Sequence, residues 1–368
     1  MPNINDYLDW RGDLTFSASP FCEVDNLIFS MLAFIDYAGI VPEMPLGMPV
    51  KLSDCLAAHR KKHPGGEEFG QIIPEINNDL FRKAAESVRF SDVYVTGYRF
   101  ELREEEHLQF AAVSFILPDN SVFVAYRGTD DTLVGWHEDF NLSFTCPVMS
   151  QRLAVEYLED IASVHRGKIR TGGHSKGGNL AVFAAVFAGK EVRERIITAY
   201  SNDGPGFLPE IIAAEQFREM APKIVTIVPQ SSVIGMLLEH SEEFTVIESS
   251  LPDSGGLFQH DPFSWSVKGP SFVHLDDLSR QGKRHDAVMS KWLSGITKEE
   301  RRQFTETLFG LLQATGAKTL TDLSTDQFAR LTAAMKSFKE LDRDTKERVY
   351  RFVRSLIETA ARSALDLR

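Results

Sequence analysis

A serine flanked by glycines is the feature of this sequence with the clearest chemical meaning. The segment Gly173-His174-Ser175-Lys176-Gly177 fits the pattern G-x-S-x-G and lies between a predicted strand and a predicted apolar helix. In such a nucleophile elbow, a strained turn lifts the serine hydroxyl above the sheet, and small neighbours let strand and helix approach closely. We therefore expect Ser175 to be a nucleophile. The alternatives are a turn that cradles a phosphate and a glycine turn with a purely structural role.

Two further segments could stabilise the oxyanion that forms when a serine attacks a carbonyl group. The backbone N–H of Lys176, at the start of a helix, would point at that charge. Residues 124–130 leave a predicted strand and bend at a glycine, so that Thr129 could offer its N–H and its hydroxyl. A plain turn, in which Thr129 caps the next element, is the alternative. We expect Asp139 to anchor this loop through Arg127 rather than to take part in the chemistry.

The composition is that of a globular protein with an acidic surface. The chain has 368 residues, 43% of them apolar and 25% charged, and about 150 residues per domain suggests two domains. The chain has 52 acidic and 40 basic residues, which gives a net charge of −12. Such a surface repels phosphates and anionic lipids, so we expect no nucleic-acid partner.

The N-terminal residues and the cysteines indicate the compartment. Residues 1–6 lack the basic and apolar regions of a signal peptide, and the most apolar stretch, 27–41, is too short to span a bilayer. Three cysteines cannot all pair, and no close-spaced Cys/His cluster offers zinc ligands. We expect a soluble cytoplasmic protein without a transmembrane segment, a metal or a cofactor.

The predicted elements divide the chain into three regions, which must position these motifs. Residues 1–90 carry helical patterns, and residues 283–368 are expected to be all helical. In residues 91–282, strands alternate with helices, which predicts an α/β fold with a mostly parallel sheet and helices on both faces. The expected strands are 93–100, 110–117, 121–126, 169–171, 196–200, 224–228 and 244–247. The expected helices are 25–35 (capped by Asp25), 52–60, 79–87, 153–164, 180–188 and 233–239, with others starting at Pro209, at Thr297, at Ser324 or Thr325, and at Leu341.

Both terminal regions are amphipathic. The helical spacing in residues 24–38 and 297–366 predicts that each region buries an apolar face. That face is expected to pack against the central region, or against a second copy of the chain in a homodimer.

The motifs together resemble those of a known enzyme family. Tyr126-Arg127-Gly128-Thr129, followed by Trp136 and Asp139, is similar to the F-R-G-T…W…D stretch of the fungal-type class 3 lipases. Residues 171–181 are similar to their T-G-H-S-L-G-G-A-L-A elbow. With Ser201-Asn202-Asp203-Gly204-Pro205-Gly206-Phe207, the combination looks closest to the bacterial, lipase-like Mbeg-like family, whose function is not known. Over residues 20–280, the resemblance implies an α/β-hydrolase fold and a Ser–acid–His triad, but no substrate.

The order of residues in α/β-hydrolases places the catalytic histidine after the serine. His260 lies in a glycine-rich loop after the last predicted strand, and it precedes a tryptophan, as the lipase histidine does. We expect His260 to be the base. His240, at the end of an expected helix, is the alternative, whereas His274 is expected to pack and His285 to be solvated.

The triad acid departs from the lipase pattern. Class 3 lipases take it from the loop after a later strand, where this sequence has Ser232. Asp203 follows the strand directly after the elbow helix, where some lipases place their acid, so we expect Asp203 to hold and stabilise the imidazolium. A turn residue in an Asp-Gly-Pro-Gly bend is the alternative for Asp203, and Asp253 and Asp261 are the alternative acids.

These residues predict a serine hydrolase that acts on a small-molecule acyl ester, a thioester or a lipid through an acyl-enzyme on Ser175. An acyltransferase would use the same residues, with an alcohol replacing water in the second step. The third interpretation is a catalytically weak scaffold whose helical ends bind protein partners, an interpretation that Ser232 favours.

Overall fold

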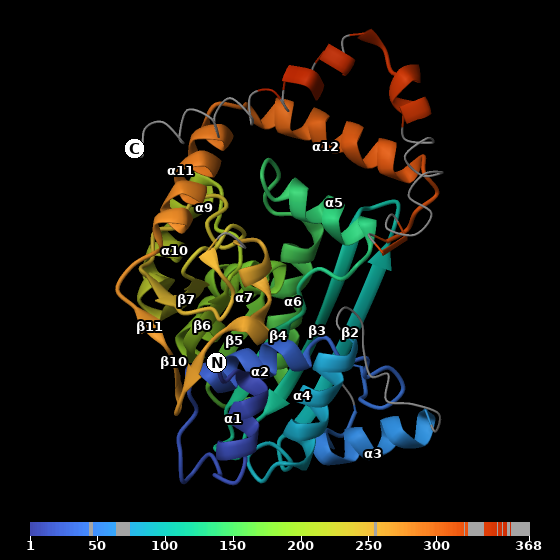
Figure 1. Ribbon diagram of the computed structural model, residues 1–368. Coiled ribbons are helices and arrows are strands. Elements are labelled where there is room, and N and C mark those ends of the chain that lie inside the picture. Colours follow the sequence, from blue (N-terminus) through green and yellow to red (C-terminus); the bar gives the residue numbers. More distant parts are fainter. Residues whose placement is uncertain are drawn as a thin grey trace.

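A nine-stranded sheet forms the centre of the protein, in the order β1-β2-β3-β4-β5-β6-β7-β8-β11 (Figure 1). The strands from β4 to β8 run parallel, whereas β1, β2, β3 and β11 pair antiparallel at the two edges. The strands are β1 (Val50–Lys51), β2 (Tyr94–Arg103), β3 (Leu108–Ile116), β4 (Val122–Tyr126), β5 (Ile169–His174), β6 (Ile196–Asn202), β7 (Ile224–Pro229), β8 (Phe244–Ile247) and β11 (His274–Leu275). The predicted α/β-hydrolase class is confirmed, with antiparallel edges added to the parallel centre.

The computed structural model describes residues 1–43, 47–63, 74–253, 256–319 and 321–322, and then 335–343, 345–347, 349–351 and 354. The helix expected from Ser324 or Thr325 and most of the helix expected from Leu341 lie outside these residues. In the described part, no helix is both long and apolar enough to cross a membrane.

Helices cover both faces of the sheet because the central strands are apolar on both. In β4, Phe123 and Ala125 join an apolar core with α1 (Ile4–Arg11), α2 (Glu23–Leu32), α3 (Leu52–Lys62) and α4 (Pro74–Glu86). Val122, Val124 and Tyr126 alternate with them and join the opposite core with α6 (Met149–Val164) and α7 (Lys176–Phe187). Alternate side chains of a strand point to opposite faces, so a continuous apolar run predicts a strand buried on both sides.

The remaining elements are short, except for two C-terminal helices. These helices are α11 (Arg280–Ser294) and α12 (Lys298–Gln313), and α12 lies over α5 (Leu133–Asn141) in Figure 1. The Phe309 ring of α12 stacks on His137 of α5, with centroids 4.5 Å apart. The short elements are α8 (Lys190–Arg195), α9 (Pro209–Ile212), α10 (Glu215–Met220), β9 (Val267–Lys268), β10 (Ser271–Phe272) and the 3₁₀ turns Ala221–Lys223, Phe258–His260 and Pro262–Ser264.

The structure differs from the sequence prediction at three helices. No helix was expected where α5 lies. The helix expected over 233–239 is absent and replaced by turns and bends, and Leu238 has φ +66°, which a right-handed helix does not contain. Gly235 passes close to Asp203 in this segment, where a Cβ would lie 2.3 Å from Oδ1. Asp25 is not the N-cap residue of α2 but the third residue of its first turn, from where its carboxylate caps the helix start by accepting the N–H of the N-cap residue Cys22 at 2.8 Å. The capping box at Thr297 is present at the start of α12.

Candidate active site

The elbow between β5 and α7 has strained backbone geometry. Ser175 adopts φ +59° and ψ −133°, outside the regions that residues with a side chain prefer. A Cβ on Gly173 would lie 2.3 Å from the Gly177 carbonyl, and one on Gly177 would lie 2.2 Å from Tyr126 O. Any larger residue at either glycine would separate strand and helix, so the two glycines allow the turn that presents Ser175 at the carboxyl edge of the sheet.

Asp203 and His260 meet at this edge. His260 Nδ1 donates to Asp203 Oδ2 at 2.6 Å, and the Asp203 carboxylate is fully buried while the His260 side chain is 22% exposed. The other oxygen of the carboxylate, Oδ1, accepts the Ser232 hydroxyl at 2.5 Å. The residue that replaces the lipase aspartate in sequence therefore contacts the carboxylate that meets His260.

The residues considered as alternative acids and bases form hydrogen bonds to residues other than Ser175, Asp203 and His260. Asp253 accepts the Ser231 hydroxyl, and Asp261 caps a 3₁₀ turn by accepting the Phe263 N–H. His240 bonds Glu242, His274 bonds Glu23 and His285 bonds Gln281. His274, expected to pack, is half-exposed instead, and His285 is partly buried rather than solvated.

The loop that carries His260 is held from two sides. The His174 ring, in the elbow, donates from Nε2 to His260 O at 2.8 Å, and the two rings lie 4.5 Å apart. Burial lowers the pKa of His174 well below its ordinary value, so this ring stays neutral. Trp265 Nε1 donates to Gln259 O at 2.9 Å. His174 occupies a variable position of the pattern G-x-S-x-G. The pattern therefore does not predict the contact of this ring with a loop 86 residues away.

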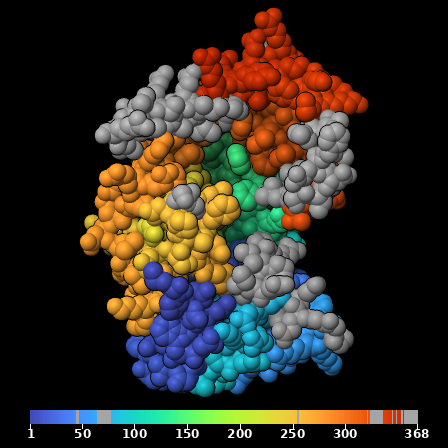
Figure 2. All heavy atoms as spheres, in the orientation of Figure 1, coloured from blue at the N-terminus to red at the C-terminus, as the bar shows by residue number. Residues whose placement is uncertain are grey.

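Ser175 and His260 line one cavity of about 860 Å³. Figure 2 shows the surface hollowed between gold atoms near residues 250–265 and orange atoms of α12, with green atoms around α5 at its base. In the described part of the chain, no hydrogen bond joins the Ser175 hydroxyl to His260. Catalytic hydrogen bonds are often long before substrate binds, and the shared cavity places both side chains where one substrate would meet them.

Two candidate oxyanion donors line the same cavity. Lys176 is the first residue of α7, so its backbone N–H has no partner within the helix. Thr129 was expected to offer an N–H and a hydroxyl, but its hydroxyl donates to Asp139 Oδ2 at 2.5 Å, which leaves the N–H. Asp139 does not anchor the loop through Arg127, which pairs with Asp130 at 3.1 Å.

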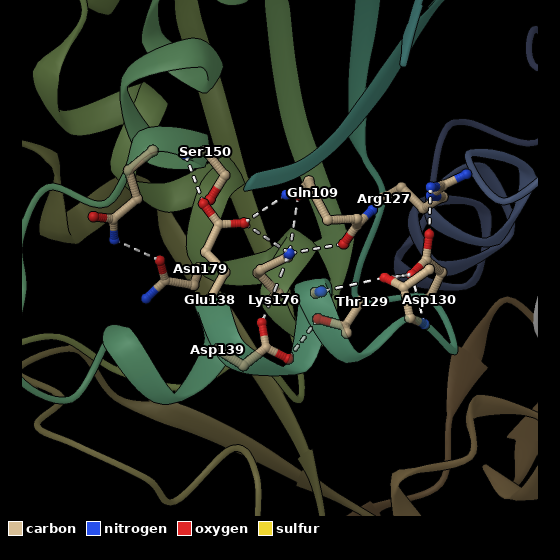
Figure 3. Close-up of polar contacts among 12 residues, drawn as sticks. Gln109, Arg127, Thr129, Asp130, Glu138, Asp139, Ser150, Lys176 and Asn179 are labelled. Carbon is tan, nitrogen blue, oxygen red and sulfur yellow. Dashed lines mark hydrogen bonds and ion pairs between the residues drawn. The ribbon is translucent and has the colours of Figure 1, made fainter. Parts of the chain in front are cut away.

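A buried ionic cluster lies behind these donors (Figure 3). Lys176 Nζ donates to Gln109 O at 3.0 Å and Oε1 at 2.7 Å, and lies 3.2 Å from Glu138 Oε2 and 3.7 Å from Asp139 Oδ1. Glu138 also accepts the backbone N–H groups of Gln109 at 3.2 Å and Ser150 at 3.0 Å. One ammonium group thus connects α7, β3 and α5.

This cluster sets the charge of the carboxylate that holds Thr129. Burial raises the pKa of Asp139 to about 6, while the Lys176 ammonium and the Thr129 hydroxyl act in the opposite direction. Lys176 therefore favours the ionised carboxylate. The sequence could have suggested a buried charge here, because Lys176 lies between an elbow serine and an apolar helix.

No group of His, Cys, Asp and Glu side chains in the described residues is arranged to hold a metal ion. The chemistry of the site can be written with protein groups alone: a strained serine, an imidazole held by a carboxylate, and backbone N–H groups at a helix start.

Comparison with known proteins identifies the family of the chain. A family model described as Mbeg1-like matches residues 84–310. The comparison with curated proteins finds no match.

Among solved structures, the chain is similar to fungal lipases at low identity. The Rhizomucor miehei lipase in its propeptide complex is 14% identical, with a TM-score of 0.37 over 67% of this chain and 80% of that one. The Lip2 lipase from Yarrowia lipolytica is 13% identical, with a TM-score of 0.34 over 62% and 79%. The lipase from Rhizopus microsporus var. chinensis is 11% identical, with a TM-score of 0.36 over 66% and 97%. These similarities carry no argument about the activity of this chain.

Proposed function

The chain belongs to the Mbeg1-like family, and we propose that it is a serine hydrolase of esterase or lipase type, with the triad Ser175, His260 and Asp203. The observation that carries the proposal is the 2.6 Å contact between His260 Nδ1 and the buried Asp203 carboxylate, at the cavity that Ser175 lines. The same contact weakens the scaffold interpretation, which depended on Ser232 in place of an acid.

The proposed reaction has two steps. Ser175 Oγ attacks the carbonyl carbon of an ester or thioester as His260 Nε2 takes its proton, and the N–H groups of Lys176 and Thr129 hold the oxyanion. His260 returns the proton to the leaving alcohol or thiol. Water then attacks the acyl-enzyme and gives a proton to His260, and His260 passes this proton to Ser175 Oγ as the acid is released.

Each role follows from physical chemistry. An imidazolium that forms beside a buried carboxylate is stabilised by it, and the Nδ1–H bond fixes the tautomer whose Nε2 accepts the proton. Donors that are already oriented stabilise the oxyanion without reorganisation during the reaction. A small-molecule acyl ester or lipid as substrate, a cytoplasmic location in a bacterium and the absence of a cofactor stay predictions.

A fluorophosphonate probe tests the proposal, because it reacts only with an activated serine. The wild-type protein and the control Ser163→Ala, at an exposed serine, should be labelled, and Ser175→Ala should not. Ser175→Ala should also lose turnover of a panel of acyl esters of increasing length, with its stability within about 1 kcal/mol of wild type. Undiminished labelling of Ser175→Ala would overturn the assignment, and an unlabelled wild-type protein without turnover would favour the scaffold.

A further inference from the structure

The C-terminal helices form one wall of the cavity that Ser175 lines. Met289 and Leu293 of α11 and Phe304 and Leu308 of α12 contribute apolar side chains to it. The cavity volume of about 860 Å³ lies in the usual range of pockets for small-molecule ligands. Apolar walls favour an apolar ligand chain, but they do not distinguish between the polar or charged groups attached to that chain.

Arg301 of α12 brings a positive charge to this largely apolar wall. Its Nη1 donates to Ser143 O at 2.6 Å and its Nη2 donates to Leu293 O, so its planar group bridges α11 and the segment after α5. Its Nε is buried and has no hydrogen-bond partner among the described residues. No carboxylate among the described residues lies within 4.0 Å of the guanidinium, whereas the exposed neighbour Arg302 pairs with Glu299 at 2.8 Å.

A partly buried guanidinium with no carboxylate beside it among the described residues is unfavourable. Burial lowers the pKa of Arg301, and no nearby carboxylate opposes that effect. A guanidinium nevertheless stays charged in proteins, so its desolvation is offset only by the two carbonyl groups. Nη1 and Nη2 each carry a second N–H besides the one that donates to a carbonyl group, and Arg301 lines the cavity, so this side chain has donors for the oxygens of a carboxylate or phosphate in a ligand.

We infer that the ligand of this cavity is an amphiphile with one apolar acyl chain and one anionic group, and that Arg301 binds the anion. The inference rests on the proposed function for the ester bond, but the anion contact itself can be measured without turnover. The anion has two sources that share this chemistry. It is a carboxylate at the far end of the acyl chain, or a phosphate on the alcohol part of the ester.

Matched ligand pairs separate the two sources. The first pair is 1-dodecanoylglycerol and its 3-phosphate, and the second is the 4-nitrophenyl ester of dodecanoic acid and the 4-nitrophenyl monoester of dodecanedioic acid. Binding is measured by isothermal titration calorimetry, below the critical micelle concentration, to the full chain carrying Ser175→Ala, so that no ligand is hydrolysed. Charge-assisted hydrogen bonds predict that the anionic member of one pair binds at least about tenfold more tightly than its neutral counterpart.

Variants at two adjacent arginines test the contact. On the Ser175→Ala background, Arg301→Gln should abolish the preference for the anion, Arg301→Lys should keep part of it, and the control Arg302→Gln should keep all of it. Thermal melting shows whether each variant is folded. If Arg301→Gln is unfolded, the test uses Arg301→Lys instead. Equal affinity within both pairs, or a preference that survives Arg301→Gln, would overturn the inference. Either result leaves the proposed function standing, because that function is decided by probe labelling at Ser175.

Discussion

Ser232 donates its hydroxyl to Asp203 Oδ1 at 2.5 Å, on the carboxylate whose Oδ2 accepts His260 Nδ1 at 2.6 Å. Asp203 follows β6 and Ser232 follows β7, the neighbouring parallel strand. Carboxyl ends of adjacent parallel strands lie side by side, so an acid on either strand can reach one histidine. We interpret Ser232 as a donor that orients Asp203.

This relationship predicts unequal losses for two substitutions. Asp203→Asn should lower kcat by orders of magnitude, up to about the 10⁴-fold loss known for the corresponding change in a serine protease, because the amide leaves the wrong tautomer. Ser232→Ala should cost about tenfold or less, because it removes one of the two bonds to the carboxylate and leaves the charge. Steady-state kinetics with a 4-nitrophenyl ester measure both variants. Equal losses, or an active Asp203→Asn variant, would contradict the assignment of Asp203 as the acid.

The parts of the fold that depend on local pattern could be predicted from the sequence. The strand expected at 244–247 matches β8 (Phe244–Ile247), and the elbow lies at Ser175, because apolar runs and glycines act over a few residues. The side chain of Lys176 could not be placed. Its partners Gln109 and Glu138 lie 67 and 38 residues away, and no local pattern encodes their approach.

The helix α5 was missed for the same reason. The sequence predicted no role for Glu138, yet Glu138 is fully buried, and Lys176 and two backbone N–H groups hold its carboxylate. Tertiary contact overrides local preference there.

The helical region before residue 91 shares a core with the sheet, which predicts that the central region does not fold alone. Leu27, Ile28 and Phe29 of α2 are fully buried, and the Phe29 ring packs against Phe115 and Phe123 with centroids 4.9 and 5.3 Å apart. A fragment of residues 91–280 would expose this apolar surface and should be insoluble or show no cooperative thermal transition. If it melts cooperatively, the terminal regions are independent modules.

The contact between α12 and α5 should weaken in acid. Burial, followed by repulsion from His107, lowers the pKa of His137 to about 4 from an unfolded value of 6.5. Between these values the folded state binds fewer protons than the unfolded state, so the contribution to stability is complete above pH 6.5 and is lost as the pH falls towards 4. His137→Phe keeps a ring on Phe309 without this proton, and its melting temperature should fall less steeply over that range than that of wild type. The exposed control His63→Phe should follow wild type, and parallel curves for all three proteins would contradict the prediction.

The last prediction concerns the ammonium group behind the elbow. Lys176→Met keeps an unbranched side chain but leaves Glu138 buried without its cation, and breaking a buried pair in this way costs about 3–5 kcal/mol. It also removes the cation that opposes the effect of burial on the pKa of Asp139, so this pKa should rise, and a larger fraction of Asp139 should be protonated near neutral pH and hold Thr129 less firmly. We therefore expect a lower free energy of unfolding, measured in urea, together with a lower kcat near neutral pH. The exposed control Lys190→Met should change neither.

A second variant separates the two effects of Lys176→Met. Adding Glu138→Gln removes the uncompensated charge, so the double variant should regain part of the lost stability, which a double-mutant cycle measures as a coupling of about 0.5–3 kcal/mol. Glu138→Gln removes a charge that raises the pKa of Asp139, but it does not restore the cation beside that carboxylate. The kcat should therefore stay well below that of wild type near neutral pH, and recover as the pH rises well above 6 and Asp139 ionises. Strictly additive stability changes would show that Lys176 and Glu138 do not interact as their 3.2 Å separation indicates. A kcat that recovers together with stability would show that Lys176 acts on the fold and not on the carboxylate that holds Thr129.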